Sequence, residues 1–146
     1  MKKLILFMLI LATSLCADME FAEPKPTFEN QRKWLIKLST DDVEKVNHTI
    51  DSVNNVMKVY PDQSLIITIV AYSKGMKVFR KDYDRNTLLR LNSLVAADVE
   101  LIGCKNTMVT MNWKEKDFIE DITYVQAGVA QVIEKVTSGW IDVTAY

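Results

Sequence analysis

The sequence predicts an α/β domain built on a parallel β-sheet. Apolar runs at residues 33–38, 64–72 and 99–104 are too short for buried helices, and segments with the apolar spacing of helices lie between them. Strands that are joined through helices by right-handed crossovers lie parallel to one another. We therefore expect their carboxyl ends to share one edge of the sheet.

Composition limits the possible functions. The 146 residues, 49% hydrophobic and 25% charged, are enough for one domain with an ordinary core. A net charge of −1, with dispersed lysines and arginines, argues against nucleic-acid binding. Gly75 and Gly103 are isolated and form no phosphate-binding loop, so we expect no cofactor.

The amino terminus resembles a secretory signal. Two lysines precede a short apolar run, which predicts a signal peptide over residues 1–17 and a mature protein that is periplasmic or secreted, without a stable membrane span. The alternative is a lipoprotein anchored at Cys16, for which Leu15 is a poor preceding residue. Residues 18–32, with Pro24 and Pro26, are predicted to be a polar tether, and residues 33–146 the folded domain.

Removal of the signal peptide would leave Cys104 as the sole cysteine. An intramolecular disulfide would then be impossible. His48 is the only histidine, so we expect neither a metal site nor a Cys-His catalytic pair. We interpret His48 itself as a surface residue of a helix.

Each further element has a local signal. Residues 39–42 can cap a helix that carries an apolar stripe and ends at Pro61. The β-branched run at 64–72 is typical of a central strand. Further helices are expected over 76–80, from Asp84 and from Lys105, then an extended piece at 122–125, a helix that ends at Gly139, and a final strand at 140–146.

Cys104 lies where the strand at 99–104 ends and the next helix begins, and this is the proposed catalytic position. Ligands of open α/β sheets bind at that edge, and a helix amino terminus favours a thiolate over a thiol. Tyr72, Ser73, Lys74 and Gly75 should reach the same edge, and with Lys105, Asn106 and Thr107 they form the predicted ligand pocket. The alternatives are a packed cysteine and an ordinary turn around Gly75.

Four segments, in order, resemble the DsrE/DsrF-like family. They are Ile69 to Tyr72 with Gly75 and Met76, Val99 to Met108, Val125 to Val129, and Ser138 to Ile141. The resemblance implies a three-layer flavodoxin-like fold with a mainly parallel five-stranded sheet and assembly into trimers or hexamers. Relatives in this family carry persulfide sulfur on a cysteine at the position of Cys104. This chain differs in its predicted export and in having Thr107 where relatives can have a second cysteine.

Two functional hypotheses follow. The first is an exported, thiol-based sulfur carrier that uses Cys104 and exchanges sulfur with a donor or acceptor protein; whether it turns over as an enzyme stays open. The second is a non-catalytic oligomeric binding module for a small anionic or sulfur-containing ligand, in which Cys104 is only packed. The acidic residues at 115–121 belong to a charged run that we interpret as a solvated face.

Overall fold

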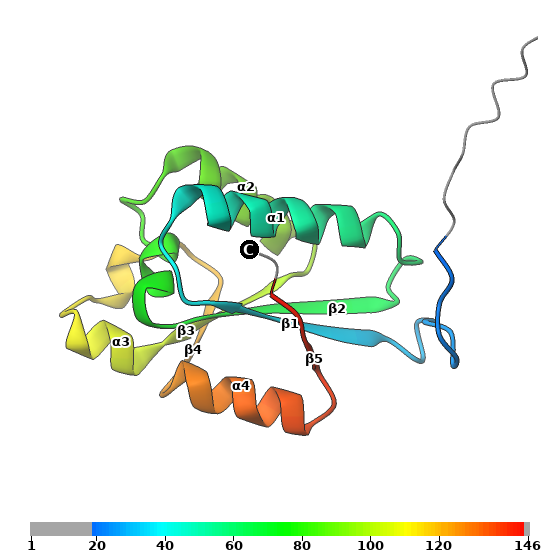
Figure 1. Ribbon diagram of the computed structural model, residues 1–146. Helices are drawn as coiled ribbons and strands as arrows, with labels where there is room; N and C mark the ends of the chain where they lie inside the picture. The colour runs from blue at the N-terminus through cyan, green and yellow to red at the C-terminus, as the bar shows by residue number, and fades with distance from the viewer. Residues whose placement is uncertain (1–18, 145–146) are drawn as a thin grey trace, which may run out of the picture.

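A computed structural model describes residues 19–144 and confirms the α/β fold (Figure 1). Five strands form one sheet in the order β4-β3-β2-β1-β5, and all neighbouring strands are parallel. The strands are β1 (Arg32–Leu38), β2 (Leu65–Ala71), β3 (Glu100–Cys104), β4 (Ile122–Val125) and β5 (Ile141–Asp142). The helices are α1 (Val43–Met57), η1 (Ser73–Phe79), α2 (Arg85–Ala96), α3 (Lys105–Thr110), η2 (Glu115–Asp117) and α4 (Gly128–Thr137), and η1 and η2 are 3-10 helices.

The chain direction explains the three layers. Strands β1 to β4 follow one another across the sheet, and right-handed crossovers place α1 and α2 on the same face. The connection from β4 returns to the far side of β1, so the same handedness places α4 on the opposite face, as Figure 1 shows. This arrangement is the flavodoxin-like topology that the resemblance implied.

Successive side chains of each strand point to opposite faces of the sheet, so the core consists of two clusters, one on each face. In β1, Ile36 and Leu38 pack beneath α1 and α2, whereas Leu35 belongs to a smaller cluster with Val70 and Ile102 that α4 covers. Strand β2 is apolar on both faces because helices cover both faces.

Some local expectations need correction. Val43 belongs to the predicted apolar stripe but is 43% exposed, because Asp42 caps α1 and leaves Val43 in the first turn beyond the core. Strand β1 begins one residue earlier than predicted, at Arg32. The final strand pairs with β1 at Trp34 and Leu35 alone and covers two residues rather than seven, since its other residues up to Thr144 lie beyond the ladder.

Residues 19–31 precede the sheet without a helix or strand of their own. They nevertheless contact the domain: the Arg32 guanidinium donates to the carbonyls of Ala22 and Pro24, and the Phe21 ring lies 5.0 Å from that of Tyr60. The predicted signal peptide, the alternative lipid site at Cys16 and the last two residues of the chain lie outside the described residues. Within 19–144, no helix combines the length and apolar character needed to cross a membrane.

Candidate functional site

A cavity of about 850 Å³ opens at the carboxyl edge of the sheet. Its position follows from the topology, because the connection after β3 runs to one face and the connection after β4 to the other, so that their first helical turns diverge. Three segments at strand ends supply most of its wall: Tyr72, Ser73 and Lys74 after β2, Cys104, Asn106 and Thr107 at the end of β3, and Ala127, Gly128 and Val129 after β4.

Cys104 ends β3 and is the N-cap residue of α3. Its side chain is buried, with the whole residue 5% exposed, yet it forms part of the cavity wall together with Tyr72 and Ser73. The backbone N–H of Cys104 donates to Met76 Sδ at 3.1 Å, and its Sγ lies 3.9 Å from the carbonyl oxygen of Gln126. The thiol is therefore held at the inner wall of the cavity rather than displayed on the surface.

Hydrogen bonds favour the thiolate of Cys104. Burial raises its pKa, but the hydroxyl of Thr107 and the backbone N–H groups of Gly128, Thr107 and Asn106 more than offset this effect and leave the pKa below its ordinary value. These donors come from the first turns of α3 and α4, where N–H groups lack partners within the helix. The pKa of Cys104 is therefore lowered by hydrogen-bond donors at the start of α3, the helix that follows its strand, and also by the Gly128 N–H at the start of α4.

Thr107 is oriented by the neighbouring turn. The backbone N–H of Ser73 donates to Thr107 Oγ1 at 3.0 Å, and Ser73 has a φ of +52°, a left-handed conformation that aims this N–H across the site. Because the hydroxyl oxygen already accepts this bond, its proton is available for the sulfur. The turns after β2 and β3 therefore act together on Cys104.

Gly128 was not among the predicted pocket residues. A Cβ atom at Gly128 would lie 3.0 Å from Tyr72 Cβ and 3.2 Å from Cys104 Cβ, so the absence of a side chain lets α4 begin directly against the thiol. The signal that could have identified it is a glycine placed shortly after a strand end, in one of the segments that resemble the DsrE/DsrF-like family.

Five of the seven predicted pocket residues line the cavity: Tyr72, Ser73, Lys74, Asn106 and Thr107. Gly75 lies outside it, buried against the end of β1, where a Cβ atom would be 1.9 Å from the Leu38 carbonyl oxygen. Lys105 lies outside as well, since its exposed ammonium pairs with Glu115 at 3.5 Å. Of the two lysines in the predicted pocket, Lys74 is the one that lies in the cavity wall.

The charged groups of the cavity are Asp41, Lys74 and Lys77. Lys77 Nζ lies 3.2 Å from Asp41 Oδ2, and this hydrogen bond holds the pKa of the Asp41 carboxyl below its ordinary value. Lys74 has no ion-pair partner among residues 19–144, so its charge is available to an anion in the cavity. In the same part of the chain, no three His, Cys, Asp or Glu side chains are placed to share a metal ion.

Comparison with solved structures finds the same fold in another protein. The chain is similar to MTH1491 of Methanobacterium thermoautotrophicum, a protein of unknown function, with a TM-score of 0.72 and 26% sequence identity over 79% of this chain and all of that one. No family model and no curated protein sequence matches the chain. The similarity therefore supports the architecture, and the chemistry must be argued from the site itself.

Proposed function

We propose that this chain is an exported DsrE/DsrF-like sulfur carrier in which Cys104 accepts and releases sulfane sulfur. The observation that supports the proposal is a thiol of lowered pKa at the wall of a cavity of about 850 Å³. The thiolate is the nucleophilic form of cysteine, and the cavity leaves room for a donor and for the added sulfur. The resemblance to DsrE/DsrF-like proteins in four segments points to the same chemistry.

The proposed step is a sulfur transfer. The Cys104 thiolate attacks the terminal sulfur of a polysulfide or protein persulfide, and a new S–S bond forms as the donor's S–S bond breaks. The electron pair leaves with the donor, which departs one sulfur shorter, while Cys104 becomes a persulfide anion. Thr107 and the N–H groups near Cys104 would stabilise negative charge, and Lys74 would attract an anionic donor.

The absence of a second cysteine after the signal peptide determines the next step. No internal thiol could resolve the persulfide, so an external thiolate, on a partner protein or a small molecule, would take the terminal sulfur and restore the Cys104 thiolate. Cleavage after Cys16 or Ala17 would place this exchange in the periplasm or outside the cell.

The test uses the full chain with Cys16→Ser, so that Cys104 is the sole thiol. After incubation with polysulfide, intact-mass analysis should show a gain of about 32 Da, one sulfur atom, that a reductant removes. The matched control adds Cys104→Ser and should gain nothing. An equal gain in that control would exclude Cys104 as the carrier.

The burial of Cys104 favours a second candidate function, a non-catalytic module that binds a small anion beside Lys74 and Thr107. Native-state thiol labelling separates the two. Rapid labelling at mildly acidic pH supports the sulfur carrier, whereas labelling that becomes fast only on unfolding supports the binding module.

We further infer that the chain assembles with copies of itself, as the resemblance implies. On α4, Val129, Ile133 and Val136 are each about half exposed and follow the spacing of one helical face. Such an apolar stripe is typical of an interface. Ile133→Lys should lower the oligomeric state measured by light scattering. Leu89→Lys, at an exposed position of α2, should leave the oligomeric state unchanged.

A further inference from the structure

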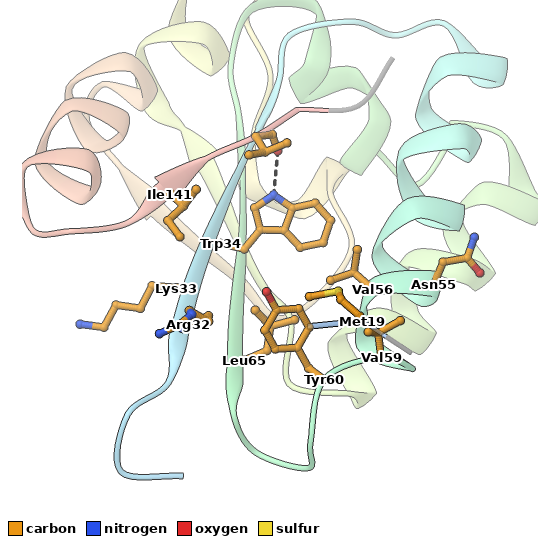
Figure 2. Close-up of a pocket in the computed structure, with 11 residues that line it drawn as sticks. Met19, Arg32, Lys33, Trp34, Asn55, Val56, Val59, Tyr60, Leu65 and Ile141 are labelled. Atoms are coloured by element: carbon orange, nitrogen blue, oxygen red, sulfur yellow. Dashed lines mark hydrogen bonds between the residues drawn. The ribbon is translucent and has the colours of Figure 1, made fainter. Parts of the chain in front are cut away.

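A second cavity of about 410 Å³ lies at the opposite, amino-terminal edge of the sheet and does not involve Cys104. Figure 2 shows its walls: Trp34 on β1, Val56 on α1, Val59 and Tyr60 just after α1, and Ile141 on β5. Met19, from the segment before β1, lies among them. With Leu65 on β2, five separate segments of the chain converge on this cavity.

This cavity exists because neither helix α1 nor strand β5 extends over it. Helix α1 ends at Met57, and β5 pairs with β1 at Trp34 and Leu35 alone, which leaves the apolar side of the sheet uncovered between them. Trp34 and Leu65 form the floor of this gap, and Ile141 and Val143 remain about half exposed at its rim.

Apart from the Tyr60 hydroxyl, the polar groups around the cavity already have partners or point away from it. Trp34 Nε1 donates to the Val143 carbonyl at 2.7 Å, drawn as a dashed line in Figure 2, and the Arg32 guanidinium donates to backbone carbonyls of the preceding segment. The side chains of Lys33 and Asn55 extend away from the interior in Figure 2. A polar ligand would therefore find few hydrogen-bond partners inside, whereas an apolar one would bury carbon against carbon.

We propose that this cavity binds a small uncharged molecule with an aromatic or hydrocarbon body. A cavity of about 150 Å³ lined by apolar side chains can hold benzene, so 410 Å³ corresponds to roughly two or three fused rings or a medium-length hydrocarbon chain. Ligand sites of small molecules begin at about 300 Å³ and are mostly apolar. Met19 lies in the cavity wall, and its unbranched side chain can adapt to the shape of an occupant.

The probe for the test is 1-aminoanthracene, an uncharged three-ring fluorophore, titrated into the full chain. We expect a saturable increase in fluorescence that corresponds to one site per chain. Val59→Trp and Ile141→Trp fill the cavity from different walls, at positions exposed enough to accept a larger side chain. Each should weaken binding by about tenfold or more, and thermal unfolding should verify that at least one of them is folded.

Two matched controls carry the same substitution elsewhere. Leu89→Trp lies on α2 away from both cavities, and Val129→Trp lies in the wall of the Cys104 cavity. Both should leave the affinity for the probe unchanged. Weaker binding in Val129→Trp, equal binding in the filled variants, or no saturable binding to the parent chain would each overturn the proposal.

Two other occupants of this cavity would each give a different result in the probe titration. If the apolar run at residues 4–12 fills the cavity, the probe will bind only after that run is replaced by serines. If a second copy of the chain fills it, the affinity for the probe will fall as the chain self-associates. Either result would overturn the proposal of an external small ligand.

Discussion

The backbone N–H of Ser73 donates a 3.0 Å hydrogen bond to the hydroxyl oxygen of Thr107, across the gap between the ends of β2 and β3. This bond orients the hydroxyl whose proton supports the Cys104 thiolate. A turn with no direct role in the chemistry therefore helps to determine the protonation of the proposed reactive sulfur. Thr107 thus acts by lowering the pKa of Cys104, and substitution of Thr107 can test this role.

Thr107→Val should raise the pKa of Cys104, because it removes a hydrogen-bond donor while it keeps a similar shape. The measurement is the pH dependence of the thiol-labelling rate in the Cys16→Ser background, whose midpoint should move upward. Thr107→Ser should restore the original midpoint. Thr110→Val is the control, since the Thr110 hydroxyl donates to the Asn106 carbonyl instead of the sulfur. An unchanged midpoint in Thr107→Val would contradict the assigned role of this hydroxyl.

Gly128→Ala should destabilise the fold by about 1–3 kcal/mol, because its methyl group would overlap the space of Tyr72 Cβ and Cys104 Cβ. Either the neighbouring side chains or the start of α4 would have to shift by a few tenths of an ångström, and a shift of α4 would lengthen the distance from the Gly128 N–H to the sulfur. Urea unfolding measures the stability loss and thiol labelling measures the effect of the shift on the sulfur. Ala130→Ser, on the exposed side of α4, should change neither. Wild-type stability and labelling in Gly128→Ala would show that the close approach is unimportant.

Lys135→Met should cost about 1–3 kcal/mol of unfolding free energy. Lys135 Nζ lies 3.0 Å from Glu100 Oε2 and 3.9 Å from the Trp140 ring centroid, and the lysine side chain is only 12% exposed. Its loss leaves the Glu100 carboxylate without its cationic partner, although the Thr68 hydroxyl still donates to it. Adding Glu100→Gln should recover part of this loss. Lys105→Met, which breaks an exposed pair with Glu115, should cost about 0.5 kcal/mol or less. Equal losses in the two single variants would contradict this ranking.

Stability should fall at alkaline pH through Tyr83. Burial, followed by the charges of Asp41, Asp84 and Asp42, raises the pKa of Tyr83 from 10.0 to about 12. Because the folded pKa exceeds the unfolded one, this contribution is complete below pH 10 and is lost as the pH rises from 10.0 to about 12. Urea midpoints across that range should drop more steeply for the parent chain than for Tyr83→Phe. Parallel curves would contradict the prediction.

Local patterns were sufficient to predict the elements of this fold. The continuous apolar run of β2 and the spaced apolar residues of α1 each report burial by their own periodicity. The place of Cys104 at a strand end could be predicted as well, since it depends on one boundary between a strand and a helix. The joining of Tyr72, Ser73 and Cys104 at one edge followed from the handedness of the crossovers.

Other features depend on contacts between distant segments. The role of Gly128 requires α4 to start against the end of β3, and the length of β5 depends on where the chain leaves the β1 edge. Lys105 and Gly75 resemble site residues in the sequence, yet Glu115 and Leu38 draw them into other contacts.

The sequence by itself determined which segments are strands and helices, the parallel direction of the strands and the edge where the thiol lies, because backbone sterics and burial periodicity act over a few residues at a time. The tertiary structure alone decided which hydrogen-bond donors surround the sulfur, which of the predicted residues lie outside the cavity and where the second cavity opens. These properties come from the packing of side chains from separate segments, and no local pattern records which segments will meet.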